Sequence, residues 1–319
     1  MSVRPIKSVI FGCQGLELTD SEKEFFRKEN PLGLILFKRN IDNPIQVQKL
    51  IRSFRRCVGR KKAPVLIDQE GGRVQRLRPP YWKKLPSADT FGELYLQDKK
   101  KAISAVKKHA SVLAKDLLNL GINTNCWPCL DLSIKESNVM ETRCYSDNPE
   151  IVAELGQISI DTALKKGLMP VVKHFPGYGR VSVDPHKGLP TVRAGLKTLK
   201  ETDFYPFRQV EQPVWGMTAH VIYTALDKEL PATISPKVIS YIRQEIGFNG
   251  FLICDDMAEM RALDSYGSKQ VLVKKILSAG CDTVLHCSGV LDDMKKLAPY
   301  IPELSKESQK RLKTAEKLL

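Results

Sequence analysis

The segment Lys173–His186 combines the side chains that acid–base chemistry needs. An apolar run leads into Lys173 and His174, and proline and glycine residues then break the strand pattern before Asp184 and His186. A carboxylate two residues from an imidazole can orient the ring and raise its pKa. Because an isolated Asp-x-His pair is also found in solvated turns, its interpretation depends on the rest of the chain.

A second segment ends an apolar run in two acids. Residues 251–254 are of a type that is usually buried, and Asp255 and Asp256 follow them directly. A carboxylate at the end of an apolar strand is costly to bury without a partner or a role. Asp256 is interpreted as a possible helix cap, which is a common position for aspartate. Asp255 is better placed to point inward from the strand end.

A third segment, Asp68–Arg76, repeats this pattern. It follows an apolar run and contains acids, two adjacent glycines and arginines. Glu70 and Arg73 are interpreted as partners that hold the glycine turn. Asp131, at the end of another predicted strand, is interpreted as structural.

The elements that position these residues follow from the hydrophobic pattern. Apolar runs rich in β-branched residues recur, and helical patterns separate them. Eight strands are predicted, at residues 8–11, 34–37, 65–67, 122–132, 168–172, 214–220, 251–254 and 283–286. Helices are predicted at residues 21–29, 44–59, 98–120, 149–166, 196–210, 236–246, 268–279 and 303–318.

Alternating strands and helices of this number predict a single-domain α/β fold, the (β/α)8 or TIM barrel, over residues 1–319. The active site of such a barrel lies at the C-terminal ends of its strands. Asp68, Lys173, His174 and Asp255 all fall at or just after predicted strand ends. The competing fold, a doubly wound open sheet, needs a glycine-rich phosphate loop after the first strand. Residues 11–15 are a weak match to such a loop.

Composition limits the other classes of protein. The chain of 319 residues has a formal net charge of +14, but its lysines lie on polar helix faces mixed with acids. No nucleic-acid-binding motif accompanies them, so no nucleic acid partner is expected. No apolar stretch of the length of a membrane span and no signal peptide are visible, so we expect no membrane association and a cytoplasmic protein.

The cysteines predict buried thiols rather than disulfides or a metal site. All eight are scattered, mostly inside apolar runs. Cys126 and Cys129 form a CxxC pair, but no second pair completes a zinc site. The chain also lacks a dinucleotide fingerprint, so no metal, nucleotide or flavin cofactor is expected.

Taken together, several segments resemble the family 3 glycoside hydrolases. More narrowly, they resemble the single-domain bacterial β-N-acetylglucosaminidases of cell-wall (peptidoglycan) recycling. The segments that carry the resemblance, in the same order as in the family, are Asp68–Arg76, Lys173–Gly177, Asp184–His186, Met217–Val221 and Cys254–Met257.

The resemblance implies a role for each of these sites. Asp255 is the implied nucleophile, and His186 the general acid/base with Asp184 as its orienting partner. The implied sugar-binding residues are Asp68, Arg76, Arg143, Lys173 and His174. Arg143 belongs to the segment 141–149, which matches the family less closely.

The chain departs from the family at three positions. Tyr178 stands where the family usually has histidine, Arg180 where it has an acid, and Pro185 where it has a small polar residue. These changes leave the dyad and the nucleophile intact, and they bear on loop conformation and substrate preference.

The expected activity is retaining exo-hydrolysis of terminal N-acetylglucosamine from muropeptides, through a covalent glycosyl-enzyme. A small carbohydrate substrate and a monomeric enzyme are expected. The alternatives are a β-glucosidase or a phosphorylase of the same family. A different class of protein, a catalytically silent barrel that binds acidic polymers through its basic surface, stays open from the sequence.

Overall fold

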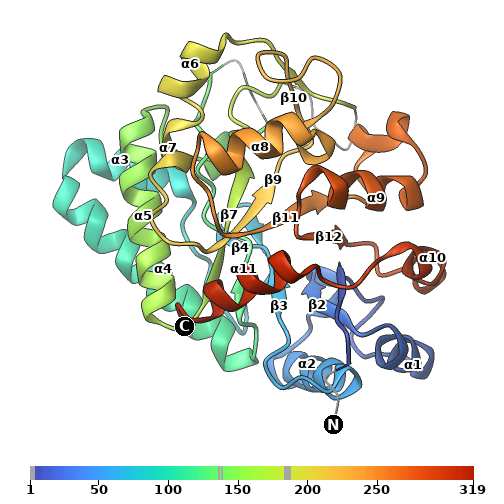
Figure 1. Ribbon diagram of the computed structural model, residues 1–319. Coiled ribbons are helices and arrows are strands. Elements are labelled where there is room, and N and C mark those ends of the chain that lie inside the picture. Colours follow the sequence, from blue (N-terminus) through green and yellow to red (C-terminus); the bar gives the residue numbers. More distant parts are fainter. Residues whose placement is uncertain (1–3, 136, 138, 183–187) are drawn as a thin grey trace.

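A closed barrel of eight parallel strands forms the centre of the molecule, as the computed structural model shows (Figure 1). The structure describes residues 4–135, 137, 139–182 and 188–319. Around the barrel the strands follow the order β1, β2, β3, β6, β7, β9, β11, β12, and β12 pairs with β1 to close it. The predicted (β/α)8 barrel is therefore confirmed.

The barrel strands are short and almost wholly buried. Their bounds are β1 Lys7–Phe11, β2 Pro31–Leu36, β3 Val65–Ile67, β6 Thr124–Asn125, β7 Met169–Phe175, β9 Trp215–Thr218, β11 Phe251–Asp256 and β12 Thr283–His286. Two small sheets lie outside the barrel, made of β4 Gln69–Gly71 with β5 Val74–Gln75 and of β8 Thr191–Val192 with β10 Ile222–Tyr223.

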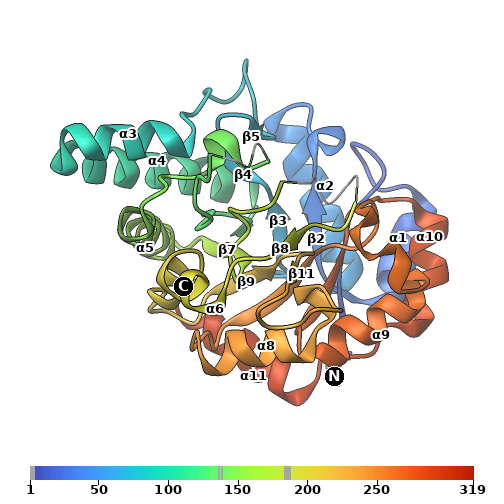
Figure 2. The ribbon, with the colours of Figure 1, turned by 90° about the horizontal axis from the view of Figure 1, so that it is seen from above.

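Helices surround the barrel, as the view from above shows (Figure 2). Their bounds are α1 Asp20–Glu29, α2 Pro44–Val58, α3 Ala88–Gln97, α4 Lys99–Leu120, α5 Pro149–Lys165, α6 Leu196–Glu201, α7 Tyr205–Arg208, α8 Pro236–Gln244, α9 Lys269–Ala279, α10 Leu291–Leu297 and α11 Lys306–Glu316. Short 3₁₀ segments are η1 Lys38–Asn40, η2 Glu141–Arg143, η3 Ala232–Ile234, η4 Arg261–Tyr266 and η5 Ala298–Tyr300.

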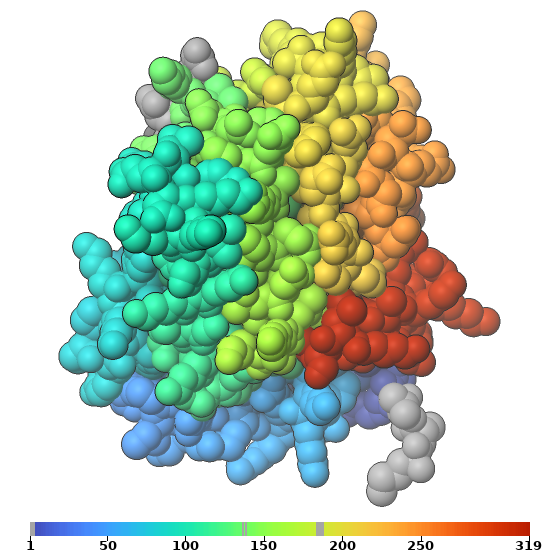
Figure 3. Space-filling view, turned by 90° about the vertical axis from the view of Figure 1, so that its left-hand side faces the viewer, coloured from blue at the N-terminus to red at the C-terminus, as the bar shows by residue number. Residues whose placement is uncertain are grey.

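Local sequence explains where the longest helix begins and ends. The side chain of Asp98 accepts a hydrogen bond from the Lys101 N–H and caps α4, and Gly121 ends the helix in the left-handed conformation at φ 91°. The buried face of α4 includes Val106, Ala110 and Leu113. α4 and α5 pack side by side and form much of one face of the molecule (Figure 3).

The final helix covers the end of the barrel opposite the strand C-termini. Leu312, on α11, lines a hollow together with Pro64, Thr124 and Trp215, which lie at or just before the starts of their strands. Figure 1 shows α11 crossing the barrel at this end. The loops that follow the strands lie at the other end of the barrel, where the strands have their C-termini.

Several predicted elements differ from the structure in extent. The helix predicted at 196–210 is divided into α6 and α7, because Thr202 leaves the helical region at φ −119° and ψ −89°. The strand predicted at 122–132 is reduced to β6, since Pro128 lacks the N–H that a continuous ladder needs. The strands β7 and β11 continue beyond their predicted ends and include Lys173, His174, Asp255 and Asp256.

Candidate active site

The main pocket lies at the C-terminal ends of the barrel strands and has a volume of about 250 Å³. Its lining residues come from loops and strands that are far apart in the sequence: Asp68, Arg73, Val74, Arg76, Val139, Arg143, Lys173, His174, Tyr178, Met217, Asp255 and Met260. The five predicted sugar-binding residues and the predicted nucleophile are all among them. Asp184 and His186 lie outside the described residues.

Two carboxylates share the buried ammonium group of Lys173 at the floor of this pocket. The Lys173 Nζ atom donates to Asp68 Oδ1 at 2.9 Å and lies 2.8 Å from Glu70 Oε1. Burial alone would lower the pKa of Lys173, but the charges of Asp68 and Glu70 outweigh it and hold the pKa well above its ordinary value. Lys173 therefore stays a fixed cation.

Asp68 is held as an anion between two cations. In addition to Lys173, the guanidinium of Arg76 donates to Asp68 Oδ2 at 3.2 Å. Burial alone would raise the pKa of Asp68, yet Lys173 and Arg76 keep it well below its usual range. The Asp68 side chain keeps 17% of its surface exposed, so it can still accept a hydrogen bond from a ligand in the pocket.

Glu70 holds Arg143 in a two-point contact. Arg143 donates through Nε at 3.0 Å and through Nη2 at 2.8 Å to the two oxygens of Glu70. Burial opposes ionisation of Glu70, but Arg143 and Lys173 lower its pKa to about 2. The expectation that Glu70 pairs with Arg73 across the glycine turn is therefore wrong. Arg73 instead lies 3.6 Å from Glu141 and donates to the Val139 carbonyl.

Glu70 is a residue of the site that sequence reasoning did not assign. Its position in the sequence could have indicated this role. Glu70 lies in β4, two residues after Asp68, and alternate side chains of an extended segment share a face. With Asp68, Lys173, Arg143 and Arg76 it forms a continuous charged network, in which each cation and anion has an opposite partner.

His174 faces a different carboxylate from its neighbour Lys173. Asp131 accepts hydrogen bonds from His174 Nδ1 at 2.8 Å and from the backbone N–H of Tyr178 at 2.6 Å. Because an ionised carboxylate only accepts, Nδ1 carries the proton of the imidazole. The opposite nitrogen, Nε2, is then free of the proton in the neutral ring and can accept a hydroxyl hydrogen from a ligand. Asp131 thus has the structural role predicted for it.

Asp255 lies at the end of β11 and lines the main pocket, with its side chain only partly buried. Its Oδ1 accepts a hydrogen bond from the Asp256 N–H at 2.8 Å, which fixes the side chain relative to the strand. Asp256 is buried and caps the loop that follows, as its carboxylate accepts from the N–H groups of Ala258 and Glu259 at 3.0 Å. Asp255 therefore lies toward the pocket as predicted, whereas the helix cap expected for Asp256 is wrong: the next helical segment, η4, begins only at Arg261, and Asp256 caps the loop before it.

Two of the three residues that depart from the family, Tyr178 and Arg180, can be located in the structure. The third, Pro185, lies outside the described residues. Tyr178 lines the pocket, and its ring centroid lies 5.3 Å from that of His174. Arg180 points away to Asp203, which accepts from its Nε at 2.7 Å. Arg180 thereby ties the start of the segment that carries Asp184 and His186 to the turn between α6 and α7.

The Cys126–Cys129 pair lies in the buried interior of the protein. All eight cysteines are buried free thiols, and burial raises the pKa of Cys126 well above its ordinary value. The ligand atoms of Cys129, Asp131 and His174 lie within 4.8 Å of one another. The Arg143 guanidinium lies 3.6 Å from the Cys129 sulfur, and this positive charge opposes a metal ion there.

Within the described residues, the helices include none that is long and apolar enough to cross a membrane.

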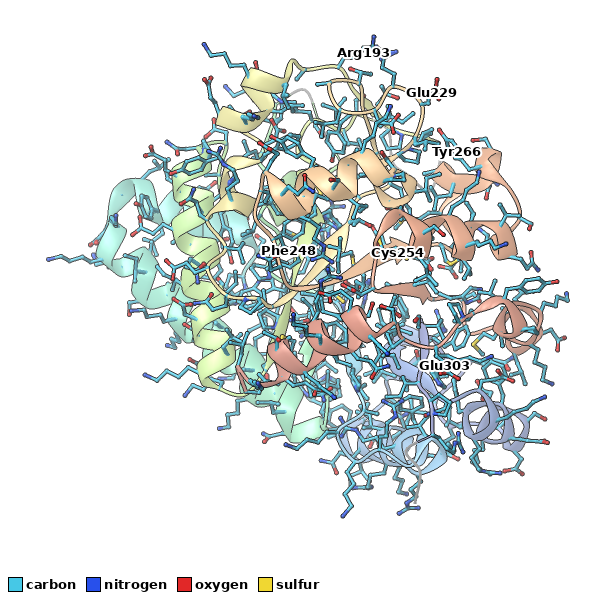
Figure 4. The ribbon with its side chains drawn as sticks, in the orientation of Figure 1. Arg193, Glu229, Phe248, Cys254, Tyr266 and Glu303 are labelled. Atoms are coloured by element: carbon cyan, nitrogen blue, oxygen red, sulfur yellow. The ribbon has the colours of Figure 1, made fainter. Side chains whose placement is uncertain are left out.

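Figure 4 labels Cys254 among the side chains that fill the centre of the molecule, whereas Arg193 and Glu229 lie at its periphery.

Comparisons with known proteins place this chain in one family. The model of the glycosyl hydrolase family 3 N-terminal domain matches residues 7–318. The chain therefore belongs to glycosyl hydrolase family 3, and it is a glycoside hydrolase with a carbohydrate substrate.

Individual relatives agree with this family. A beta-hexosaminidase of Nitrosomonas eutropha is 34% identical over 281 residues, which cover 86% of this chain and 78% of the relative. A beta-hexosaminidase of Bordetella avium is 32% identical over 306 residues, covering 94% of this chain and 87% of the relative.

Solved structures show the same architecture. NagZ from Neisseria gonorrhoeae in complex with N-trifluoroacetyl-D-glucosamine superposes with a TM-score of 0.87 at 30% identity, covering 99% of this chain and 91% of that one. A family 3 β-N-acetylglucosaminidase from a Paenibacillus strain gives a TM-score of 0.85 at 29% identity. This chain spans 61% of the Paenibacillus protein.

Proposed function

We propose that the protein is a retaining exo-β-N-acetylglucosaminidase. The observation that carries the proposal is the placement of Asp255, a carboxylate at a strand end, in the same pocket of about 250 Å³ as residues of the charged network. The activities in the names of the related proteins support it, since these are beta-hexosaminidases and β-N-acetylglucosaminidases. All remaining roles below are part of this proposal.

The charged network is suited to bind a sugar. A pyranose presents hydroxyl groups that both donate and accept, so recognition needs donors and acceptors held at fixed positions. Asp68 offers an acceptor, Lys173, Arg76 and Arg143 offer donors, and His174 offers Nε2. Because their mutual ion pairs hold these groups in place, little conformational entropy is lost when the sugar binds.

Asp255 acts as the nucleophile. An oxygen of its carboxylate attacks the anomeric carbon, the glycosidic bond breaks, and the leaving oxygen takes a proton from His186. The covalent glycosyl-enzyme is then hydrolysed by water, whose proton returns to His186. Asp184 orients the imidazole and favours its protonated form.

The resemblance to the single-domain bacterial enzymes extends the proposal to the substrate and the setting. We infer a muropeptide derived from peptidoglycan as the substrate, a monomer as the active form, and the cytoplasm as the place of action. The cationic donors Arg73 and Arg76 at the pocket wall are compatible with an aglycone that carries carboxylates.

The stereochemistry of the product tests the mechanism. With a β-linked aryl N-acetylglucosaminide, we expect the first-formed sugar to be the β-anomer in proton NMR spectra recorded during turnover. An α-anomer formed first would contradict the double displacement. If the aryl glucoside is cleaved faster than the N-acetylglucosaminide, the protein is instead a β-glucosidase, and a sugar 1-phosphate as product would identify a phosphorylase.

The role of His186 has its own test. His186→Ala should slow substrates with poor leaving groups by about 10²- to 10⁴-fold, because their departing oxygen needs a proton. Activated aryl glycosides need little protonation and should be slowed much less. Equal losses of kcat/KM on both substrate types would exclude His186 as the acid, and Asp184→Ala should show a milder form of the same pattern.

A further inference from the structure

A second pocket, the rim pocket, lies at the ends of β11 and β12 and has a volume of about 140 Å³. It is lined by Ala258, Lys269, Gln270, His286, Ser288, Asp293, Lys296 and Leu297, none of which lines the main pocket. In Figure 1, β12 lies between α9 and α10, whose residues form two of the walls. β11 and β12 are the seventh and eighth strands of the barrel, and the loops after these strands often bind phosphate in barrel enzymes.

The rim pocket presents more donors than acceptors. Lys269 and Lys296 supply ammonium groups. The Ser288 oxygen accepts from the Val290 N–H at 3.2 Å, which leaves the hydroxyl hydrogen of Ser288 to be donated. Lys269 and Gln270 are also the first residues of α9, so the positive end of this helix faces the same space.

His286 is the most deeply buried polar residue of the rim pocket. It is 3% exposed, and its Nδ1 atom has no hydrogen-bond partner within the described part of the chain. A buried polar atom without a partner is unfavourable, and the residue that carries it lines the rim pocket. Asp256 is close enough to affect the ring electrostatically, but its oxygens already accept from backbone N–H groups, including that of Cys287 at 2.9 Å.

The charges of the rim pocket favour an anion. Asp293 lies 3.9 Å from Lys296, and Asp264 lies 3.5 Å from Lys269. Both acids are more than half exposed, so these ion pairs are weak and can open for a ligand. A cation would meet two ammonium groups and a helix N-terminus. With about 30 Å³ for one water molecule, the volume holds a tetrahedral oxyanion and a few attached atoms.

We propose that the rim pocket binds a phosphate group, either as inorganic phosphate or as part of a small phosphate monoester. Lys269 and Lys296 neutralise its charge, and Ser288, His286 and the N-terminus of α9 donate hydrogen bonds to its oxygens. The proposal does not depend on the glycosidase mechanism, because the two pockets share no lining residue.

Calorimetric titration with inorganic phosphate and with glucose 6-phosphate tests the proposal. The titrations are made on the full chain with N-acetylglucosamine at saturation, so that the cationic main pocket is occupied. The test variant is Lys269→Gln/Lys296→Gln. The matched control is Lys274→Gln/Lys295→Gln, which removes two exposed lysines from the same helices without touching the rim pocket.

We expect saturable binding of at least one probe, weakened by about tenfold or more in the test variant and by less than about twofold in the control. His286→Asn should also weaken binding. Both lysine variants should hydrolyse an aryl N-acetylglucosaminide as the unmodified protein does, which verifies their folds. Tighter binding of glucose 6-phosphate identifies a monoester as the ligand, and tighter binding of inorganic phosphate identifies the free ion.

Three results would overturn the proposal. The first is the absence of saturable binding of both probes at millimolar concentrations. The second is an equal loss of affinity in the test variant and in the control, which means a general effect of surface charge. The third is binding seen only without N-acetylglucosamine and lost in Arg76→Gln, which places the anion in the main pocket.

Discussion

Asp255 and Asp256 are neighbours at the end of the same strand, yet their surroundings differ completely. Asp256 is buried, and the N–H groups of Ala258, Glu259 and Cys287 point at its oxygens from 2.9 to 3.0 Å. Within the described residues, Asp255 accepts one hydrogen bond, from the Asp256 N–H, and it lines the main pocket. A carboxylate whose oxygens accept hydrogen bonds from several backbone amides holds the backbone in place. A carboxylate that lines a pocket can instead interact with a substrate.

A third carboxylate, that of Glu70, has a different kind of hydrogen-bond partner. Its partners are the charged groups of Arg143 and Lys173 rather than backbone amides. It therefore holds two cations of the site at once, and its ionisation is linked to the stability of the fold. The three acids differ in what a neutral replacement should do, and this difference can be measured.

The largest effect is expected for Asp255→Asn. The amide has the size of the carboxylate but cannot attack the anomeric carbon, so kcat should fall by at least about a thousandfold. The free energy of unfolding in urea should change by less than about 0.5 kcal/mol, since the side chain is only partly buried at a pocket. Steady-state kinetics with an aryl N-acetylglucosaminide and urea melts give both quantities.

The control for this variant is Asp292→Asn, an exposed acid on α10. It should leave both turnover and stability unchanged. Turnover of Asp255→Asn close to that of the unmodified protein would exclude Asp255 as the nucleophile.

Glu70→Gln is expected to act mainly on stability, by about 3 kcal/mol at neutral pH, because it removes the buried counter-charge of Arg143 and leaves Lys173 with Asp68 alone. It should also change the response to acid. The pKa of Glu70 is lowered from 4.5 to about 2 in the fold. Its stabilising contribution is therefore complete above pH 4.5 and is lost as the pH falls toward 2.

Urea melts at a series of pH values check this prediction. The loss of stability between neutral pH and pH 3 should be smaller in Glu70→Gln than in the unmodified protein, as one of the titrating groups is gone. Glu141→Gln, which removes a half-exposed acid paired with Arg73, should keep the full acid response. If Glu70→Gln and the unmodified protein lose the same free energy of unfolding between neutral pH and pH 3, the loss comes from groups other than Glu70.

Local patterns in the sequence predicted the barrel and several residues of the main pocket, whereas Arg76 and Arg143 were implied only by the family resemblance. Apolar runs that end in Asp68, Lys173 and Asp255 mark strands whose ends meet at one rim of the barrel. The pairing inside the pocket could not be predicted in this way. Glu70 could reach Arg73 nearby or Arg143 from a distant segment, and only the packed fold decides between them.

The same limit applies to His286. Its place at a strand end was visible in the sequence. That its Nδ1 atom has no hydrogen-bond partner among the described residues depends on how α9, α10 and the loop after β11 pack around it. The break between α6 and α7 was also hidden, since residues 196–210 keep a helical pattern. Thr202 and Asp203 instead turn the chain there, and Asp203 accepts from Arg180.

The smallest effect is expected for Asp256→Asn, which tests the other half of the comparison. Oδ1 of Asp256 accepts from the N–H groups of Ala258 and Cys287, and Oδ2 accepts from that of Glu259. An asparagine amide can place only one oxygen among these donors, and its NH2 group must face an N–H. The free energy of unfolding should therefore fall by about 2 kcal/mol, measured in urea melts, with an unchanged denaturant slope.

Activity should respond to this variant only indirectly. The loop that Asp256 caps leads to Met260 in the main pocket, so we expect a raised KM and a kcat within about tenfold of the unmodified protein. Asp264→Asn, at an exposed position in η4, is the matched control and should alter neither stability nor KM. If Asp256→Asn instead abolishes turnover at full stability while Asp255→Asn remains active, the two carboxylates have the opposite roles. Asp256 would then be the nucleophile despite its three amide donors.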